Sequence, residues 1–261
     1  MTQPVSVEVR AGVARVVLCR PERGNAIDLA TARGLLAAAI RCRQEGVRAV
    51  VLSGAGRSFC VGGDLREFSA LSGDALAGHL RAVTDALHGA LRGFAELDAP
   101  MVAAVQGAVA GAGVGLAAAA DLTIAAADAT FVLAYTGIGY SPDAGVTWSL
   151  PRLIGPRRAL DLLLTNRRVD AREAAEIGLV SRVVEAGQLA AEVDRLAAGL
   201  AGGATAAFGA TRRLVAAGLS AERGRHLDHE AEALAAAAVS AEGREGVAAF
   251  LAKRPARFHP E

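Results

Sequence analysis

The chain of 261 residues has only three cysteines, one lysine and an aromatic content of 4%. The cysteines (Cys19, Cys42 and Cys60) are odd in number and scattered, so they predict neither a disulfide framework nor a metal site with paired cysteine spacing. Because Lys253 is the only lysine, a Walker A lysine or a Schiff-base lysine is excluded at every other position. We expect a reduced, cytoplasmic protein without a metal centre.

An excess of charge of one sign is also lacking, since 28 Lys and Arg residues balance 27 Asp and Glu residues. This balance gives no general electrostatic argument for binding nucleic acid or an anionic membrane. The first residues contain neither a basic segment nor a long apolar run, so we do not expect a secretion signal. The uncharged stretch 99–120 has the length of a membrane span, but its Ala and Gly residues are only weakly apolar. We therefore expect no nucleic-acid partner and no membrane partner.

The same uncharged stretch is the segment around which the rest of the chain is organised. Met101–Val105 is a short apolar run that is typical of a buried strand, and Leu116–Ala120 favours a helix. Glycine lets the backbone between them bend or approach another group closely, and it occurs at positions 107, 111, 113 and 115. The spacing G-x-G-x-G differs from the dinucleotide pattern G-x-G-x-x-G. The glycines therefore indicate a ligand site or simply a helix packed close to a sheet.

Short strands alternate with helices along the chain, and 52% of the residues are hydrophobic, so a sizeable core is expected. The pattern predicts an α/β fold of stacked ββα units followed by a helical end. We expect strands at 5–10, 13–18, 49–52, 101–105, 121–125, 130–133 and 180–184, helices at 28–45, 74–97, 158–164, 171–177 and from 189 onward, and a loop at 137–155.

Two glycine-rich stretches, Ser58–Leu65 and Ala104–Gly115, each follow a buried strand and precede a helix. Together with later motifs in the same order, they make the chain resemble the crotonase (enoyl-CoA hydratase/isomerase) superfamily; these motifs are Ile138–Gly145, Leu150–Gly155, Leu164–Arg168, Ala174–Val180 and Phe250–Arg254. The resemblance implies a crotonase-type spiral of ββα units over 1–195 and a C-terminal helical trimerisation region over 196–261. It also implies an acyl-CoA substrate, no cofactor beyond the CoA moiety of that substrate, and a homotrimer or homohexamer.

The resemblance further implies an oxyanion hole, in which two backbone N–H groups hold the thioester oxygen while negative charge develops on it. By motif position the two donors are the N–H groups of Val61 and Ala112. Residues expected to lie along the CoA are Arg23, Ala26, Gly63, Asp64 and Leu65, and Phe250 and Lys253 are expected to reach the CoA of a neighbouring subunit.

Family members differ in their acid and base groups. Hydratases of this family use two glutamates, but the corresponding positions here hold Gly115 and Tyr135, neither of which can act as a carboxylate base. The carboxylate left in that neighbourhood is Asp143, which could move a proton along an acyl chain if apolar surroundings raise its pKa. We therefore predict an enoyl-CoA isomerase that uses Asp143. The sequence Pro142-Asp143 could also be an ordinary turn.

Three other interpretations stay open. His88, Asp143 and Tyr135 resemble the histidine, aspartate and tryptophan of aryl-CoA dehalogenases, in which the aspartate attacks an aromatic carbon and the histidine activates water. A hydratase that holds its water without the glutamate pair is the second alternative. A CoA-thioester binding protein without catalysis is the third.

Overall fold

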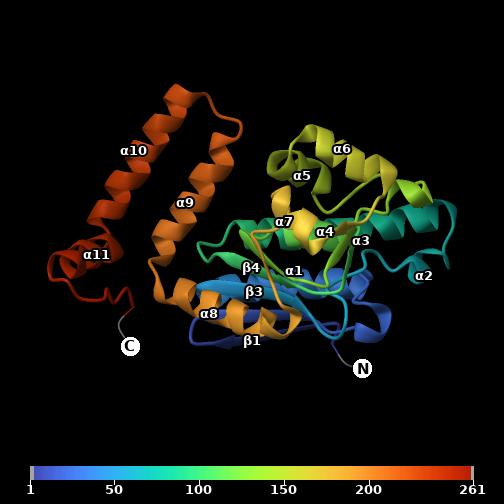
Figure 1. The fold of residues 1–261 in the computed structure, drawn as a ribbon, viewed down its shortest axis with the longest axis horizontal. Coiled ribbons are helices and arrows are strands. Elements are labelled where there is room, and N and C mark those ends of the chain that lie inside the picture. The colour runs from blue at the N-terminus through green and yellow to red at the C-terminus, as the bar shows by residue number, and fades with distance from the viewer. Residues whose placement is uncertain (1–2, 260–261) are drawn as a thin grey trace.

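The computed structural model describes residues 3–259, and its centre is a six-stranded sheet with the order β1-β2-β3-β4-β6-β9 (Figure 1). β1 and β2 form an antiparallel hairpin, and the pairs from β2 to β9 are parallel. A smaller sheet has the order β5-β7-β8. The strands are β1 Val5–Arg10, β2 Val13–Leu18, β3 Ala49–Gly54, β4 Met101–Val105, β5 Ala108–Ala110, β6 Leu122–Ala126, β7 Thr130–Val132, β8 Val169–Asp170 and β9 Arg182–Val184.

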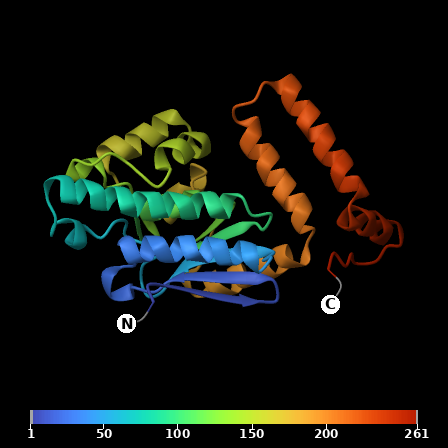
Figure 2. The same ribbon diagram turned by 180° about the vertical axis from the view of Figure 1, so that it is seen from behind.

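Helices cover both faces of the large sheet, which explains why its central strand β4 is apolar and buried throughout. α1 (Leu29–Gln44) and α3 (Gly73–Ala95) pack on one face, and α8 (Leu189–Gly202) packs on the other (Figure 2). The shorter helices of the body are α2 Leu65–Phe68, α4 Ala112–Ala118, α5 Val146–Ile154, α6 Pro156–Thr165 and α7 Ala171–Glu176, with 3₁₀ turns η1 Pro21–Arg23, η2 Thr136–Ile138 and η3 Ala186–Gln188.

Most predicted elements are confirmed, and the mixed α/β class is confirmed with them. The predicted start of the α4 helix at Leu116 was wrong, since α4 begins at Ala112. The predicted loop 137–155 was wrong in its second half, where α5 lies. Glycine and proline in this segment indicated a loop, but Gly145 and Gly155 only flank the helix, while Val146, Leu150 and Ile154 bury one face at four-residue spacing.

The last three helices form an arm that extends beyond the body: α9 (Thr205–Gly218), α10 (Arg223–Val239) and α11 (Ala241–Leu251) (Figure 1). α10 has no buried residue, and large apolar side chains such as Leu234 and Val239 are more than 70% exposed. The predicted division after residue 195 stays a prediction. Position 195 lies inside α8, which packs on the sheet through residues on both sides of it.

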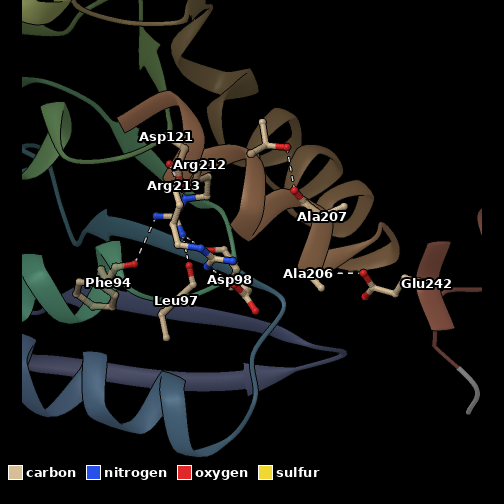
Figure 3. Close-up of polar contacts among 11 residues, drawn as sticks. Phe94, Leu97, Asp98, Asp121, Ala206, Ala207, Arg212, Arg213 and Glu242 are labelled. Atoms are coloured by element: carbon tan, nitrogen blue, oxygen red, sulfur yellow. Dashed lines mark hydrogen bonds and ion pairs between the residues drawn. The ribbon is translucent and has the colours of Figure 1, made fainter. Parts of the chain in front are cut away.

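Arg212 fastens α9 to the body (Figure 3). Its guanidinium lies 2.7 Å from the Asp121 carboxylate and also donates to the carbonyl oxygens of Phe94, Leu97 and Ala99, near the end of α3. A cation at a helix C-terminus is favourable because the last carbonyl groups lack helical partners. The neighbouring Arg213 pairs with Asp98, but both side chains are about half exposed. No helix within residues 3–259 is long and apolar enough to cross a membrane.

Candidate active site

A cavity of about 470 Å³ opens between the two glycine-rich loops, helix α3 and the segment that follows β7. Its walls are chiefly apolar, and Asp143 is the only carboxylate among the residues that line it. An apolar cavity with few polar groups is the usual form of a small-molecule site. The lining residues are Ile27, Val61, Gly62, Gly63, Leu65, Phe68, Leu80, Val83, Thr84, Leu87, Gly111, Ala112, Leu133, Ala134, Tyr135, Ile138, Gly139, Tyr140, Ser141, Pro142 and Asp143.

The two glycine-rich loops meet at the floor of this cavity. Cys60 and Val109 form a parallel β-bridge, in which Ala110 N–H donates to the Cys60 carbonyl. Gly113 must be glycine because a Cβ there would lie 2.2 Å from the Cys60 carbonyl oxygen. A Cβ on Gly62 would lie 3.5 Å from the nitrogen of Ala112. The close approach therefore brings backbone groups of both loops to one place.

Of the two N–H groups predicted to form the oxyanion hole, that of Ala112 is free among the residues that the structure describes, whereas that of Val61 already donates a hydrogen bond within the chain. Ala112 is the first residue of α4, and its N–H makes no hydrogen bond within residues 3–259. Val61 N–H donates to the carbonyl of Gly24 at 3.1 Å, so the prediction of Val61 as a donor was wrong.

Gly63 follows Val61 by two residues in the same loop and differs from it in its backbone hydrogen bonding. It forms a parallel bridge with Ile27, and this bridge uses the carbonyl of Gly62 and the N–H of Asp64. The N–H of Gly63 therefore points away from Ile27, and it has no acceptor in the described part of the chain. Motif spacing alone could not identify this free N–H, because the direction of an N–H depends on which strand pairs with the loop.

Asp143 is held by Tyr135, whose hydroxyl donates to its Oδ1 at 2.6 Å. Burial, together with the charge and the hydrogen bond of Asp143, raises the pKa of Tyr135 far above its ordinary value. Tyr135 is therefore a neutral donor at physiological pH and not a base. Both side chains line the cavity, so the structure brings together two residues that the sequence singled out.

His88 is not among the residues that line the cavity. Its Nε2 accepts the backbone N–H of Ala144 at 3.2 Å, next to Asp143 in the chain. The three residues of the predicted dehalogenase-like group are thus close together. The lone pair that would activate water is, however, already engaged by Ala144.

Gly115 stands where hydratases of this family have a glutamate, and the space around it explains why a side chain does not fit there. A Cβ on Gly115 would lie 2.6 Å from both the Cβ and the carbonyl oxygen of Ala144. The segment that carries Asp143 therefore occupies the space that a side chain at position 115 would need. A glutamate at 115 and this position of Asp143 exclude each other.

Of the residues predicted to lie along CoA, some line the cavity and others are buried or lie in a neighbouring loop. Gly63 and Leu65 line the cavity. Asp64 is buried and bonded to Arg20 at 2.9 Å; burial alone would raise its pKa, but Arg20 and nearby backbone N–H groups lower it.

Arg20 is a residue that the sequence did not indicate. It also donates to the carbonyl of Ala26 at 2.7 Å, and it pairs with Asp28. It thereby orders the loop that carries Ala26 and the exposed Arg23. Asp64, the acid that Arg20 binds, is 44 residues away along the chain, so no local spacing could have revealed the pair.

Phe250 lies in α11 of the arm (Figure 1), Lys253 follows that helix, and neither is among the residues that line the cavity. Phe250 is in the last turn of α11 and is 82% exposed. Lys253 follows the end of that helix in a left-handed conformation, with φ 53°.

Comparison with known proteins agrees with this geometry. The family model "Enoyl-CoA hydratase/isomerase" matches residues 8–261. The chain belongs to the enoyl-CoA hydratase/isomerase family. The resemblance to the crotonase superfamily is thereby confirmed, and membership supports an enzyme with an acyl-CoA substrate.

Relatives within this family carry several chemistries. The chain is 42% identical to a Rhodobacter capsulatus protein named "Probable enoyl-CoA hydratase", with 97% of each chain covered. It is 36% identical to the 1,2-epoxyphenylacetyl-CoA isomerase of Escherichia coli, with 99% of each covered. It is 32% identical to 4-chlorobenzoyl coenzyme A dehalogenase-2 of an Arthrobacter species, covering 95% of this chain and 91% of that one. Relatives of this chain are therefore named as a hydratase, an isomerase and a dehalogenase.

A solved structure confirms the crotonase-type fold. A Mycobacterium abscessus protein described as an enoyl-CoA hydratase/isomerase superposes with a TM-score of 0.92 at 40% identity, covering 98% of this chain and 100% of that one.

Proposed function

We propose that this family member is an enoyl-CoA isomerase in which Asp143 moves a proton along the acyl chain. The observation that carries the proposal is that, among residues 3–259, Asp143 is the only carboxylate lining the cavity and is oriented there by Tyr135. Proton transfer by a positioned carboxylate needs such an orientation and a site close to the reacting carbon.

The reaction begins when the Asp143 carboxylate removes a proton from C2 of a 3-enoyl-CoA. The electron pair moves into the thioester group, and the resulting enolate oxygen accepts hydrogen bonds from Gly63 N–H and Ala112 N–H. The protonated Asp143 then returns the proton to C4, which restores the thioester carbonyl and leaves the double bond between C2 and C3. No cofactor beyond the CoA moiety takes part in this proposal.

Hydration fits the cavity less well. Neither Gly115 nor Tyr135 supplies a carboxylate, and Tyr135 is un-ionised because its pKa is raised. A hydratase would therefore have one carboxylate for both activating water and protonating the acyl chain. This is the reason for preferring isomerisation over the hydration named for one relative.

Displacement on a halogenated aryl-CoA is the second candidate function. The adjacency of His88, Asp143 and Tyr135 favours it, and a dehalogenase is among the relatives. In that reaction Asp143 would attack the aromatic carbon. The histidine, however, would first have to release the N–H of Ala144.

The proposal extends to the CoA and to assembly. Arg23, Ala26, Asp64 and Leu65 would lie along the CoA moiety, and Phe250 and Lys253 would contact the CoA held by a neighbouring subunit. The exposed apolar side chains of the arm would be covered in a homotrimer or homohexamer, with 1–195 as the binding core and 196–261 as the oligomerisation region. We place the protein in the cytoplasm because its three cysteines are unpaired.

The test is a proton NMR time course in deuterated buffer, with a 3-enoyl-CoA and a 2-enoyl-CoA in separate samples. Double-bond migration with deuterium at C2 or C4 supports the proposal. Addition of water to the 2-enoyl-CoA supports a hydratase. Binding without turnover of either compound, or of a halogenated aryl-CoA, supports a binding protein and overturns the proposal.

A further inference from the structure

The contact between His88 and Ala144 shows which ring nitrogen accepts a hydrogen bond. A backbone N–H can only donate, so the Nε2 atom that accepts the Ala144 N–H at 3.2 Å must carry its lone pair. The imidazole is then neutral, with its remaining proton on Nδ1. If Nε2 carried a proton, its N–H would face the N–H of Ala144, and two donors cannot form a hydrogen bond with each other.

The residue that His88 holds has an uncommon backbone conformation. Ala144 and Gly145 have φ values of 51° and 73°, and Val146 N–H donates to the Asp143 carbonyl at 3.1 Å. Two consecutive positive φ values are typical of turns that contain Asn or Gly, and an alanine is strained there. Ala144 is also 2% exposed, so its N–H has no access to water as an alternative acceptor.

Three contacts therefore hold the turn formed by residues 143–146. His88 of α3 accepts its N–H, Gly115 of α4 leaves room for Ala144, and Tyr135 binds the Asp143 carboxylate. Leu87, next to His88 on the same helix, lines the cavity wall. Helix α3 thus forms one wall of the cavity and also holds the turn that carries Asp143.

We infer that His88 is a positioning residue, which acts as a hydrogen-bond acceptor for Ala144 and thereby orients the Asp143 carboxylate. This inference rests on the proposed function, because it assigns His88 a role in the proton transfer by Asp143. It differs from the water-activating role of the dehalogenase-like interpretation. In the inferred role the imidazole accepts a hydrogen bond and takes no part in the proton transfer.

Without the acceptor, the N–H of Ala144 would be buried and unpaired, which is costly, and the turn would shift. A displacement of about 1 Å at a reacting group can lower a rate about 100-fold. Contacts with CoA lie elsewhere in the site and would stay. Loss of the acceptor should therefore lower kcat and leave KM nearly unchanged.

The kinetic experiment compares His88→Leu, which has no acceptor, with His88→Gln, whose amide oxygen can replace Nε2. We expect kcat of His88→Leu to fall about 10- to 100-fold with little change in KM, and His88→Gln to recover most of the loss. Near-ultraviolet circular dichroism of Trp148 and the thermal midpoint would show whether each variant folds. Unchanged kcat in His88→Leu overturns the inference. So does a His88→Gln variant that folds but is as slow as His88→Leu, because the imidazole itself would then be required.

A second measurement does not depend on activity. Long-range ¹H–¹⁵N correlation spectra of the folded wild-type protein report the tautomer of each of the five histidines, and His88→Gln identifies the signal of His88. We expect an unprotonated Nε2 at neutral pH, and slow amide exchange of Ala144 in the wild type and His88→Gln but faster exchange in His88→Leu. A protonated Nε2, or equal exchange in all three proteins, overturns the inference. If the wild type turns over no enoyl-CoA, the proposed function fails, and this measurement still decides whether His88 holds the turn.

Discussion

Two cavities formed by the described residues 3–259 differ in their chemistry, and the one with the larger volume has fewer reactive side chains. The cavity in the body, of about 470 Å³, is lined by Asp143 and Tyr135 among apolar side chains. The groove in the arm, of about 690 Å³, lies between α9, α10 and α11 and is lined mostly by alanine and glycine. Three of its four polar residues, Arg213, Ser240 and Glu242, already have hydrogen-bond partners within the chain, and the fourth is His229. Polar groups that converge, and not volume, distinguish a reactive site from a packing surface.

The substitution with the largest expected effect is Asp143→Asn, which tests whether the carboxylate makes the cavity in the body the reactive one. We expect kcat to fall by about 10²–10⁴-fold, because a neutral amide cannot accept the proton. The dissociation constant for a saturated acyl-CoA, measured by calorimetry, should stay within about threefold. A variant that retains wild-type turnover of the confirmed substrate would show that the cavity's carboxylate is not the proton carrier.

Tyr135→Phe removes only the hydroxyl that holds Asp143. A hydrogen bond to a charged group contributes about 1.5–3 kcal/mol, so kcat should fall about 10- to 150-fold if the bond serves the transition state. Steady-state kinetics with the same substrate would measure this. An unchanged kcat would mean that Asp143 is oriented without Tyr135.

The raised pKa of Tyr135 also predicts an alkaline effect. In the unfolded chain a tyrosine ionises at about pH 10, but the folded Tyr135 stays neutral to higher pH. The stability that it contributes is fully present below the unfolded pKa and is lost as the pH rises toward the folded pKa. Near-ultraviolet absorbance should show one of the two tyrosines ionising only as the protein unfolds, and Tyr135→Phe should remove that late step.

Gly115→Ala tests whether position 115 and the Asp143 turn exclude each other. The new Cβ would lie 2.6 Å from Ala144, so we expect a loss of about 1–3 kcal/mol in the free energy of unfolding and a lower kcat. Gly187→Ala is the matched control, because a Cβ there meets nothing within 4 Å. Denaturant titration of both variants would compare them, and equal stabilities would contradict the steric explanation.

The smallest effects concern the attachment of the arm. Arg212→Ala removes one hydrogen bond from each of three carbonyl groups and from Asp121, which keeps its bond from Met101 N–H, and we expect it to lower the free energy of unfolding by about 1–3 kcal/mol. Arg213→Ala removes an exposed pair and should cost about 0–1 kcal/mol. Urea unfolding at matched protein concentration would measure both. A larger effect for Arg213 would mean that this exposed pair, rather than Arg212, holds the arm.

Much of the fold could be predicted because its signals are local. The strand Met101–Val105 is continuous and apolar, and Asp28 caps α1 by accepting from Thr31 N at 2.7 Å. The helix α5 was missed because flanking glycines and an internal proline outweighed its four-residue apolar period. Apolar residues at a fixed spacing indicate a helix or strand, whereas glycine and proline at or near its ends suggest a loop instead.

The sequence by itself determined most of the strands and helices in their order along the chain, the two glycine-rich loops, and Asp143 as the candidate carboxylate. Only the tertiary structure decided that Gly63 and not Val61 offers a free N–H, that Arg20 binds Asp64, and that the lone pair of His88 faces Ala144. The physical reason is that composition and spacing are local, while the partner of each hydrogen-bonding group is chosen by segments that meet only when the chain folds.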